Sequence, residues 1–441
     1  MIFGILGIHL FNLVDTFFVG RLGTEELAAM SFTFPVVFVI GGVALGLGLG
    51  ASAVVSHAIG EGDWHRVRRL TTDSLTLGLL VVASLIIVGL STVDPVFRML
   101  GASEELLPLI KSYMYVWYPG MIFVVIPMVG NNCIRATGDT RTPSLIMILA
   151  GAVNGVLDPL FIFGIGPFPR LGLSGAALAT VIGRSITFSV ALYVLGRRER
   201  MLTRELPGFA EIRRSWGSVL HIGVPGALTN ILVPIGIGAI TRIVSVHGVA
   251  AVAGFGVASR IETFALTPIM ALRSVIAPFV GQNWGARRHD RLRRGVTLSF
   301  WLSAAWGIVA WLVLVFAGRP IASVFNSTPE VVATTALYLS IVPLAYGMRG
   351  ALYQATGTLS VLRKPFHAAA LMLLQVFVLY VPLAVLGSRI MELRGVFGAG
   401  FLSNVVAGAV GILWVRHVMA LRRREHAETP EVEVSADPVE A

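Results

Sequence analysis

Long apolar runs separated by short polar connections make up most of this chain. A helix needs roughly 20 residues to cross a hydrocarbon core of about 30 Å, and twelve runs approach or exceed that length. The runs cover residues 1–19, 27–58, 68–92, 107–134, 143–166, 174–196, 216–245, 250–283, 295–317, 330–356, 366–388 and 396–419. Strands are excluded because an open strand leaves backbone groups unpaired in lipid and the runs are too long for barrel strands. The pattern predicts an all-α integral membrane protein with twelve transmembrane helices.

The positive charges lie mainly in alternate connections between these runs. An even number of spans places both termini on one side, together with the loops that contain "HRVRR" and "RRHDRLRR". This side carries 22 of the 34 Lys and Arg residues, and the opposite side carries 7. Because Lys and Arg concentrate in cytoplasmic loops, we expect a multi-pass protein of the cell inner (plasma) membrane with both termini in the cytoplasm.

The chain repeats itself at a spacing of about 225 residues. The segment "SHAIGEGDWHRVRR" at 56–69 matches "GQNWGARRHDRLRR" at 281–294, and "RATG" at 135 matches "QATG" at 354 with a slightly smaller shift. Each half contains six spans, so the halves point the same way and are related by an axis along the membrane normal. The sequence therefore predicts two pseudo-symmetric six-helix lobes.

This repeat divides the chain into four regions. They are an N-terminal six-helix lobe at 1–196, a cytoplasmic inter-lobe linker at 197–215, a C-terminal six-helix lobe at 216–420 and a cytoplasmic tail at 421–441. The tail is acidic and contains proline, so we expect it to be disordered. The second half enters its first span through "RRSWGSVLHIGVP", which the first half lacks. We expect either a translation start upstream of Met1 or a genuinely shortened first helix.

Composition narrows the class further. Hydrophobic residues make up 55% of the 441 positions and charged residues 13%, against about a quarter charged in soluble domains. The net charge of +10 does not indicate nucleic-acid binding, because the Arg clusters lie between apolar runs without interleaved aromatic residues. Cys133 is the one cysteine, so no intramolecular disulfide forms. We expect no removable signal peptide, because no basic segment, short apolar run and A-x-A site occur in order.

Several segments together resemble the multidrug and toxic compound extrusion (MATE) family of secondary transporters. They are "LVDTFFVGRLG", "GDTRTPS", "NGVLDPLFIFG", "HIGVPGALTN" and "ASRIETFALTPIMALRSVIAPFVGQNWGA". The resemblance covers essentially the whole chain and implies a twelve-helix, two-lobe exporter. It is closest to the DinF-like branch, because "ALTNILVPIGIGA" in span 7 lacks the carboxylate expected of the NorM-like branch. That departure weakens any expectation of a sodium site in the second lobe.

Two carboxylates interrupt the apolar spans of the first lobe. Asp15 and Asp158 lie at similar predicted depth in the outer half of spans 1 and 5. Each has an asparagine on its own helix face, Asn12 at i−3 and Asn154 at i−4. Pro159 follows Asp158 and cannot donate a backbone N–H, so we expect a kink and a polar pocket there.

An ionised carboxylate at this depth costs several kcal/mol, so it either pairs with a cation or keeps a proton. We therefore expect cationic substrates and protons to compete for Asp15 and Asp158 as the lobes alternate in access. The MATE resemblance implies the same, since aspartates at these two motif positions belong to the coupling and substrate site of the family. The alternative is that both carboxylates pair with an arginine such as Arg184 and hold the helices together.

The second lobe has its own intramembrane carboxylate, Glu262, which we rank second as a site residue together with Arg260. Three arginines are close in the predicted spans, namely Arg242, Arg260 and Arg273, and a structural ion pair between Glu262 and one of them is favoured over ion binding. In the first lobe, Arg184 is either a counter-charge for Asp158 or a packing residue. No metal site and no cofactor are expected beyond a coupling ion, H⁺ or Na⁺.

The function classes can now be ordered. The chain contains no P-loop, no H-E-x-x-H and no G-x-S-x-G, so we expect a transporter driven by an ion gradient and not an enzyme. The favoured function is a secondary antiporter that exports organic cations and amphipathic drugs in exchange for H⁺ or Na⁺. The alternative is a flippase for lipid-linked precursors with the same broad plan. We expect a monomer whose partners are these small molecules and the lipid bilayer.

Overall fold

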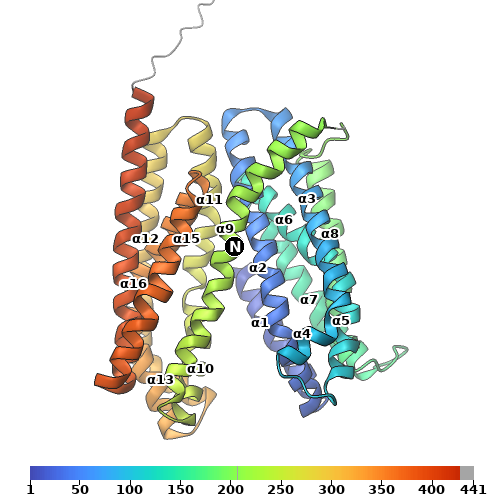
Figure 1. Ribbon diagram of the computed structural model, residues 1–441, viewed down its shortest axis with the longest axis vertical. Helices are drawn as coiled ribbons and strands as arrows, with labels where there is room; N and C mark the ends of the chain where they lie inside the picture. The colour runs from blue at the N-terminus through green and yellow to red at the C-terminus, as the bar shows by residue number, and fades with distance from the viewer. Residues whose placement is uncertain (206, 428–441) are drawn as a thin grey trace, which may run out of the picture.

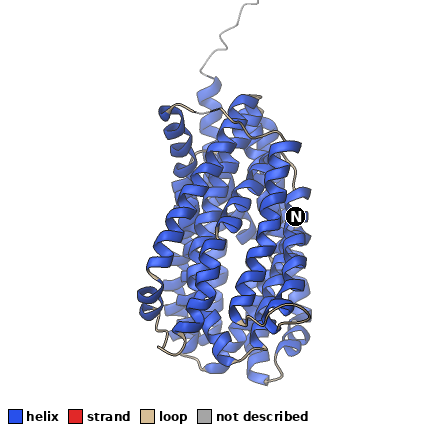
Figure 2. Cartoon of the chain, turned by 90° about the vertical axis from the view of Figure 1, so that its right-hand side faces the viewer, coloured by secondary structure: helices blue, strands red, loops and turns tan. Residues whose placement is uncertain are grey.

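The computed structural model describes residues 1–205 and 207–427, and the side chains of all of these except residues 8–13, 24 and 421–427. These residues form helices and loops without a strand (Figure 2). The first half contains α1 (Ile2–Gly20), α2 (Thr24–Glu61), α3 (Trp64–Ser91), α4 (Val93–Met99), α5 (Leu107–Gly120), α6 (Ile122–Ala136), α7 (Arg141–Phe163), α8 (Leu173–Tyr193) and a π-helical turn, η1 (Val194–Arg198).

The second half repeats this arrangement. It contains α9 (Phe209–Ser245), α10 (Val249–Ala265), α11 (Thr267–Gly285), α12 (His289–Phe325), α13 (Pro329–Ile341), η2 (Val342–Ala345), α14 (Tyr346–Val361), α15 (Pro365–Leu373), η3 (Leu374–Tyr380) and α16 (Val381–Ala427). Figure 1 shows the two halves as neighbouring bundles, with blue and cyan helices in one and yellow to red helices in the other.

The helices account for the twelve predicted spans. Within the described residues, eight helices are long and apolar enough to cross a membrane. Two bent pairs of helices, α5 with α6 and α10 with α11, raise the number of spans to ten when each pair counts as one span. The last of these, 365–420, contains two predicted spans, because non-helical backbone at Met391 and Glu392 breaks α16. With the 19-residue α1, the total is twelve. The predicted fold class is confirmed.

Two spans are bent where the sequence places proline. The axes of α10 and α11 differ by 45°, and Pro268 lies in the first turn of α11. A proline ring clashes with the carbonyl four residues earlier and supplies no N–H, so the helix cannot pass straight through this point. The axes of α5 and α6 differ by 42°, with Pro119 near the end of α5.

The two lobes meet along helices that carry glycine at the contact. A Cβ added to Gly46 of α2 would lie closer to the Gly223 carbonyl oxygen of α9 than real Cβ atoms come, so a larger residue at this crossing would force the helices apart. Beyond this crossing, Gln282 Nε2 of α11 donates to the Ala136 carbonyl at 2.7 Å. These contacts join the lobes on the side that carries residues 199–208, called here the linker side.

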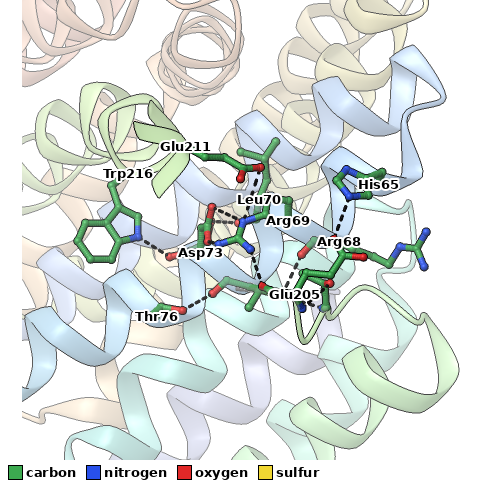
Figure 3. Close-up of polar contacts among 12 residues, drawn as sticks. His65, Arg68, Arg69, Leu70, Asp73, Thr76, Glu205, Glu211 and Trp216 are labelled. Carbon is green, nitrogen blue, oxygen red and sulfur yellow. Dashed lines mark hydrogen bonds and ion pairs between the residues drawn. The ribbon is translucent and has the colours of Figure 1, made fainter. Parts of the chain in front are cut away.

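The linker itself is held against the first lobe (Figure 3). Arg69 is buried near the start of α3, where Nη2 and Nε donate to Asp73 at 2.6 and 3.1 Å and Nη1 donates to the Glu205 carbonyl at 2.8 Å. The Trp216 indole N–H of α9 donates to the Asp73 carbonyl at 3.0 Å. Within the predicted linker region 197–215, η1 ends at Arg198 and α9 begins at Phe209. One buried arginine thus fixes the path between the lobes.

Candidate functional site

The polar centre of the first lobe lies where α1 packs on α7. Asp15 of α1 is 8% exposed and Asp158 of α7 is 0% exposed. The two carboxyl groups interact electrostatically, and Tyr113 of α5, itself buried, interacts with both. Two buried carboxyl groups on packed helices and a buried phenol on a third therefore lie within electrostatic range of one another.

Asn154 connects this centre to α8. It lies one helical turn before Asp158 and is 2% exposed. With the amide oriented to satisfy its neighbours, Nδ2 donates to Asp158 Oδ2 at 2.6 Å and the amide oxygen accepts from the Thr180 hydroxyl and N–H, both at 3.1 Å. This chain of hydrogen bonds fixes the Asp158 carboxyl in one orientation.

No guanidinium or ammonium group of the described side chains forms an ion pair with either carboxyl group. Asp15 Oδ1 is buried without a hydrogen-bond partner in that part of the chain. Arg184 of α8 does not pair with Asp158; it borders a cavity of about 10 Å³ together with Asn154 and Thr180. The ion pair with Arg184 that the sequence left open is therefore absent from these contacts.

Two further predicted features are not decided by these contacts. Helix α7 runs from Arg141 to Phe163 as one element with Pro159 inside it, and a small cavity is lined by Asn154, so the kink at Pro159 stays a prediction. The side chain of Asn12 lies outside the described residues, so its predicted place beside Asp15 stays a prediction.

The structural ion pair predicted for Glu262 exists, but the predicted partners are wrong. Glu262 accepts from Arg349 Nη1 at 2.6 Å, from the Tyr338 hydroxyl at 2.5 Å and from the Tyr346 hydroxyl at 3.2 Å. Arg260 is exposed, because residues two positions apart on a helix point in nearly opposite directions. The acid is instead neutralised from α14, which the sequence alone does not place next to α10.

A cavity of about 220 Å³ opens beside this ion pair. Aromatic side chains form part of its wall, and Gln375 and Asn404 also line it. Arg349 and Tyr353 had not been singled out in the sequence. The signal was present, since an arginine in an apolar span is a site hypothesis by default.

Comparison with known proteins gives the family. The family model MatE matches residues 1–160 and 225–386. The FAD transporter of Shewanella oneidensis is 38% identical over 405 residues, which cover 92% of this chain and 90% of that protein. The probable multidrug resistance protein YoeA of Bacillus subtilis is 28% identical over 327 residues, covering 72% of this chain and 70% of that protein.

A solved structure extends the match to three dimensions. The crystal structure of the Vibrio cholerae MATE transporter VcmN in the bent form superposes with a TM-score of 0.91 at 28% identity, covering 96% of this chain and 95% of that one. The relatives and structural neighbours are membrane transporters and not enzymes. Placement in the DinF-like branch stays a prediction. On the family model and the 38% identical relative, this chain belongs to the MATE family of transporters.

Proposed function

We propose that this transporter exports amphipathic organic compounds in exchange for protons, and that Asp15 and Asp158 carry the exchange. The observation that supports this most is a pair of buried carboxyl groups to which no cationic group among the described side chains is bonded. Its natural setting is the plasma membrane, with both termini in the cytoplasm and the protein acting as a monomer.

The proton chemistry follows from charge and burial. Two ionised carboxylates close together in a membrane interior repel each other and lack hydration, so the pair holds at least one proton or a bound cation. The Asn154 amide donates to one oxygen of Asp158 and stabilises the ionised form of that residue once a proton leaves. A substrate that carries positive charge can replace the proton, and a proton arriving from the other side can release the substrate.

Alternating access supplies the second half of the mechanism. The two lobes are separate bundles that meet through glycine contacts on the linker side. Rigid rotation of one lobe against the other would open the Asp15–Asp158 site to one side of the membrane at a time. Protonation on one side and deprotonation on the other then give net exchange.

Two substrate classes are supported by the relatives. The names of several relatives, YoeA and the MepA proteins among them, refer to multidrug resistance or export, which favours organic cations and amphipathic drugs. The 38% identical relative is named as an FAD transporter, which makes a flavin nucleotide the second candidate. A flippase for lipid-linked precursors remains the alternative outcome of the test.

The test is transport by the purified protein in sealed vesicles under an imposed pH gradient or an imposed sodium gradient. Ethidium and FAD are the two probes, and Asp158→Asn is the variant. We expect transport driven by the pH gradient, with a loss of at least about 100-fold in Asp158→Asn, because the amide cannot exchange a proton. Asp94→Asn is the matched control, since Asp94 forms a surface ion pair with Lys111 and such pairs contribute little.

Each outcome has a distinct meaning. Normal transport by Asp158→Asn at equal insertion would overturn the proposed site. Transport driven by sodium and not by pH would replace the proton by a metal cation. No movement of either probe with either gradient would favour the flippase.

A further inference from the structure

The two lobes carry a basic segment at the same place in the repeat, and in the first lobe most of its charge is neutralised. Arg66 at the start of α3 pairs with Glu61 at 2.5 Å. Arg69 is buried and donates to both oxygens of Asp73 (Figure 3). Two of the arginines of this segment therefore have carboxylates of their own lobe as partners.

The second lobe repeats the arginines without these acids. At the shift of 225 residues, both arginines recur, but Ala286 and Leu298 stand where the two carboxylates would be. Arg288 stands where the first lobe has Asp63, which caps α3 by accepting from a backbone N–H. The second half of the chain thus keeps the positive charges of this segment and loses the negative ones.

Five arginines at the start of α12 are exposed as a result. We call them the basic start of α12: Arg287, Arg288, Arg291, Arg293 and Arg294. None of them forms an ion pair with a carboxylate of the described side chains. Asp290 is the one acid among residues 286–295, so the positive charge of the segment is largely without a partner in this part of the chain.

This segment continues into a face of α12 that is directed out of the bundle. Helix α11 ends at Gly285 on the linker side, and α12 follows from His289. Leu298 and Trp301 are 58% and 70% exposed, and they lie four and seven residues beyond Arg294, so all three share one helix face. Exposed apolar side chains on a membrane span contact acyl chains. Arg294, about 10 Å along the helix from Trp301, therefore lies near the lipid headgroups.

We propose that the basic start of α12 binds the headgroups of anionic phospholipids in the leaflet on the linker side and so anchors the second lobe at the membrane surface. Guanidinium groups bind phosphate oxygens with charge-assisted hydrogen bonds, and arginine clusters next to a membrane span attract anionic lipid. The apolar face below Arg294 favours a lipid over a free phosphate, because it contacts the acyl chains of the same molecule. This inference is independent of the exchange site in the first lobe.

Lipid binding to the purified full-length protein tests this. Native mass spectrometry measures the affinity of the protein in detergent for phosphatidylglycerol and for phosphatidylcholine. We expect phosphatidylglycerol to bind at least about tenfold more tightly, and this preference should fall to about threefold or less in Arg293→Gln with Arg294→Gln. The matched control is Arg213→Gln with Arg214→Gln, which should keep the full preference. Both pairs are exposed, and each pair provides the fifth and sixth residues of its helix.

The outcomes separate this site from a general effect of charge. Equal affinity of the wild-type protein for the two lipids overturns the proposal, and so does an unchanged preference in the α12 variant. An equal loss in the α9 control overturns it as well, because net charge alone would then explain the result. Displacement of phosphatidylglycerol by an equal concentration of glycerol phosphate would assign the site to a free phosphate and overturn the lipid assignment.

Two further measurements complete the test. Because the substituted side chains are exposed, the α12 variant should unfold at the wild-type temperature in phosphatidylcholine, which distinguishes loss of the site from loss of the fold. The wild-type preference should also weaken as salt is raised from about 0.1 M to 1 M, since salt screens exposed charges. A preference that is insensitive to salt overturns the proposal. Failure of the proposed exchange function shows instead as normal transport by Asp158→Asn, whatever these lipid results are.

Discussion

The two lobes share one helical plan, but their buried charges have opposite character. In the first lobe, Asp15 and Asp158 lie together without a cationic partner among the described side chains. In the second lobe, Glu262 accepts hydrogen bonds from Arg349 and two tyrosines. Another arginine, Arg273, lies over the ring of Tyr353. The repeat therefore conserves the framework while the buried polar groups differ.

This difference indicates how one fold can divide two tasks. A carboxyl group without a fixed counter-charge can take up and release a proton as its access to water changes. A carboxylate bonded to a guanidinium and two phenols instead joins helix α10 to α13 and α14. On this comparison, the first-lobe carboxyls suit ion exchange, and the second-lobe carboxylate suits a structural role.

Glu262→Gln should give the largest effect on folding, because it tests whether Glu262 is structural. Replacing one partner of a buried ion pair leaves the Arg349 charge unpaired, and we expect the free energy of unfolding to fall by about 3 kcal/mol. Thermal unfolding in detergent measures this. The double variant Glu262→Gln with Arg349→Gln removes the orphaned charge, so it should recover part of the loss.

The result decides whether the lobes differ. If Glu262→Gln folds as stably as the wild-type protein and loses pH-driven transport, then Glu262 is a second exchange site and the two lobes act alike. An equally low stability of the single and double variants would show that the ion pair itself is not the source of the effect.

The framework was largely predictable from sequence because helix spans depend on local composition. The charged stretch around Arg389, Glu392 and Arg394 separates two predicted spans, and the backbone of α16 is non-helical within it, at Met391 and Glu392. The bend before Pro268 follows from the geometry of proline. Gly46 and Gly223 lie in contact where α2 and α9 pack on each other.

The polar contacts were only partly predictable, because they join distant parts of the chain. Asp15 and Asp158 come together as their similar depths suggest, since depth in a membrane can be read from span position. The Arg349–Glu262 pair joins residues 87 positions apart, and no periodicity specifies which helix faces α10. The bond from Thr180 to Asn154 was missed for the same reason.

Asn154→Leu should sharpen the description of the first-lobe site with an intermediate effect. The change removes the donor to Asp158 and leaves the Thr180 hydroxyl without its acceptor. A hydrogen bond to a charged group contributes about 1.5–3 kcal/mol, so we expect pH-driven transport to fall about tenfold or more. Vesicle uptake of ethidium measures it. Thr180→Val loses only the hydrogen bond from the Thr180 hydroxyl to Asn154, and it should reduce transport about threefold. A larger loss in Thr180→Val would place the critical contact on α8.

Asp139→Asn should give the smallest effect, and it completes the contrast with Asp158. Asp139 lies in the connection before α7, outside the spans, where Arg198 Nη2 pairs with it at 3.2 Å. Partial burial raises the pKa of Asp139. Hydrogen bonds from the Thr142 hydroxyl and from the N–H groups of Thr142 and Arg141, together with the nearby Arg198, lower the pKa by more than burial raises it. The pKa of Asp139 therefore lies below its usual value.

A carboxyl group whose pKa is lower in the folded state contributes stability above its unfolded pKa of about 3.9, and loses that contribution as the pH falls through the folded pKa. We therefore expect Asp139→Asn to lower the melting temperature slightly at pH 7, through a loss below about 1 kcal/mol. The difference from the wild-type protein should shrink as the pH falls below about 4. A difference that does not change between pH 7 and pH 3 would show that Asp139 acts through the shape of the turn and not through its charge. In that case, the contrast between a paired surface carboxylate and the unpaired carboxyls of the first lobe would rest on Asp15 and Asp158 alone.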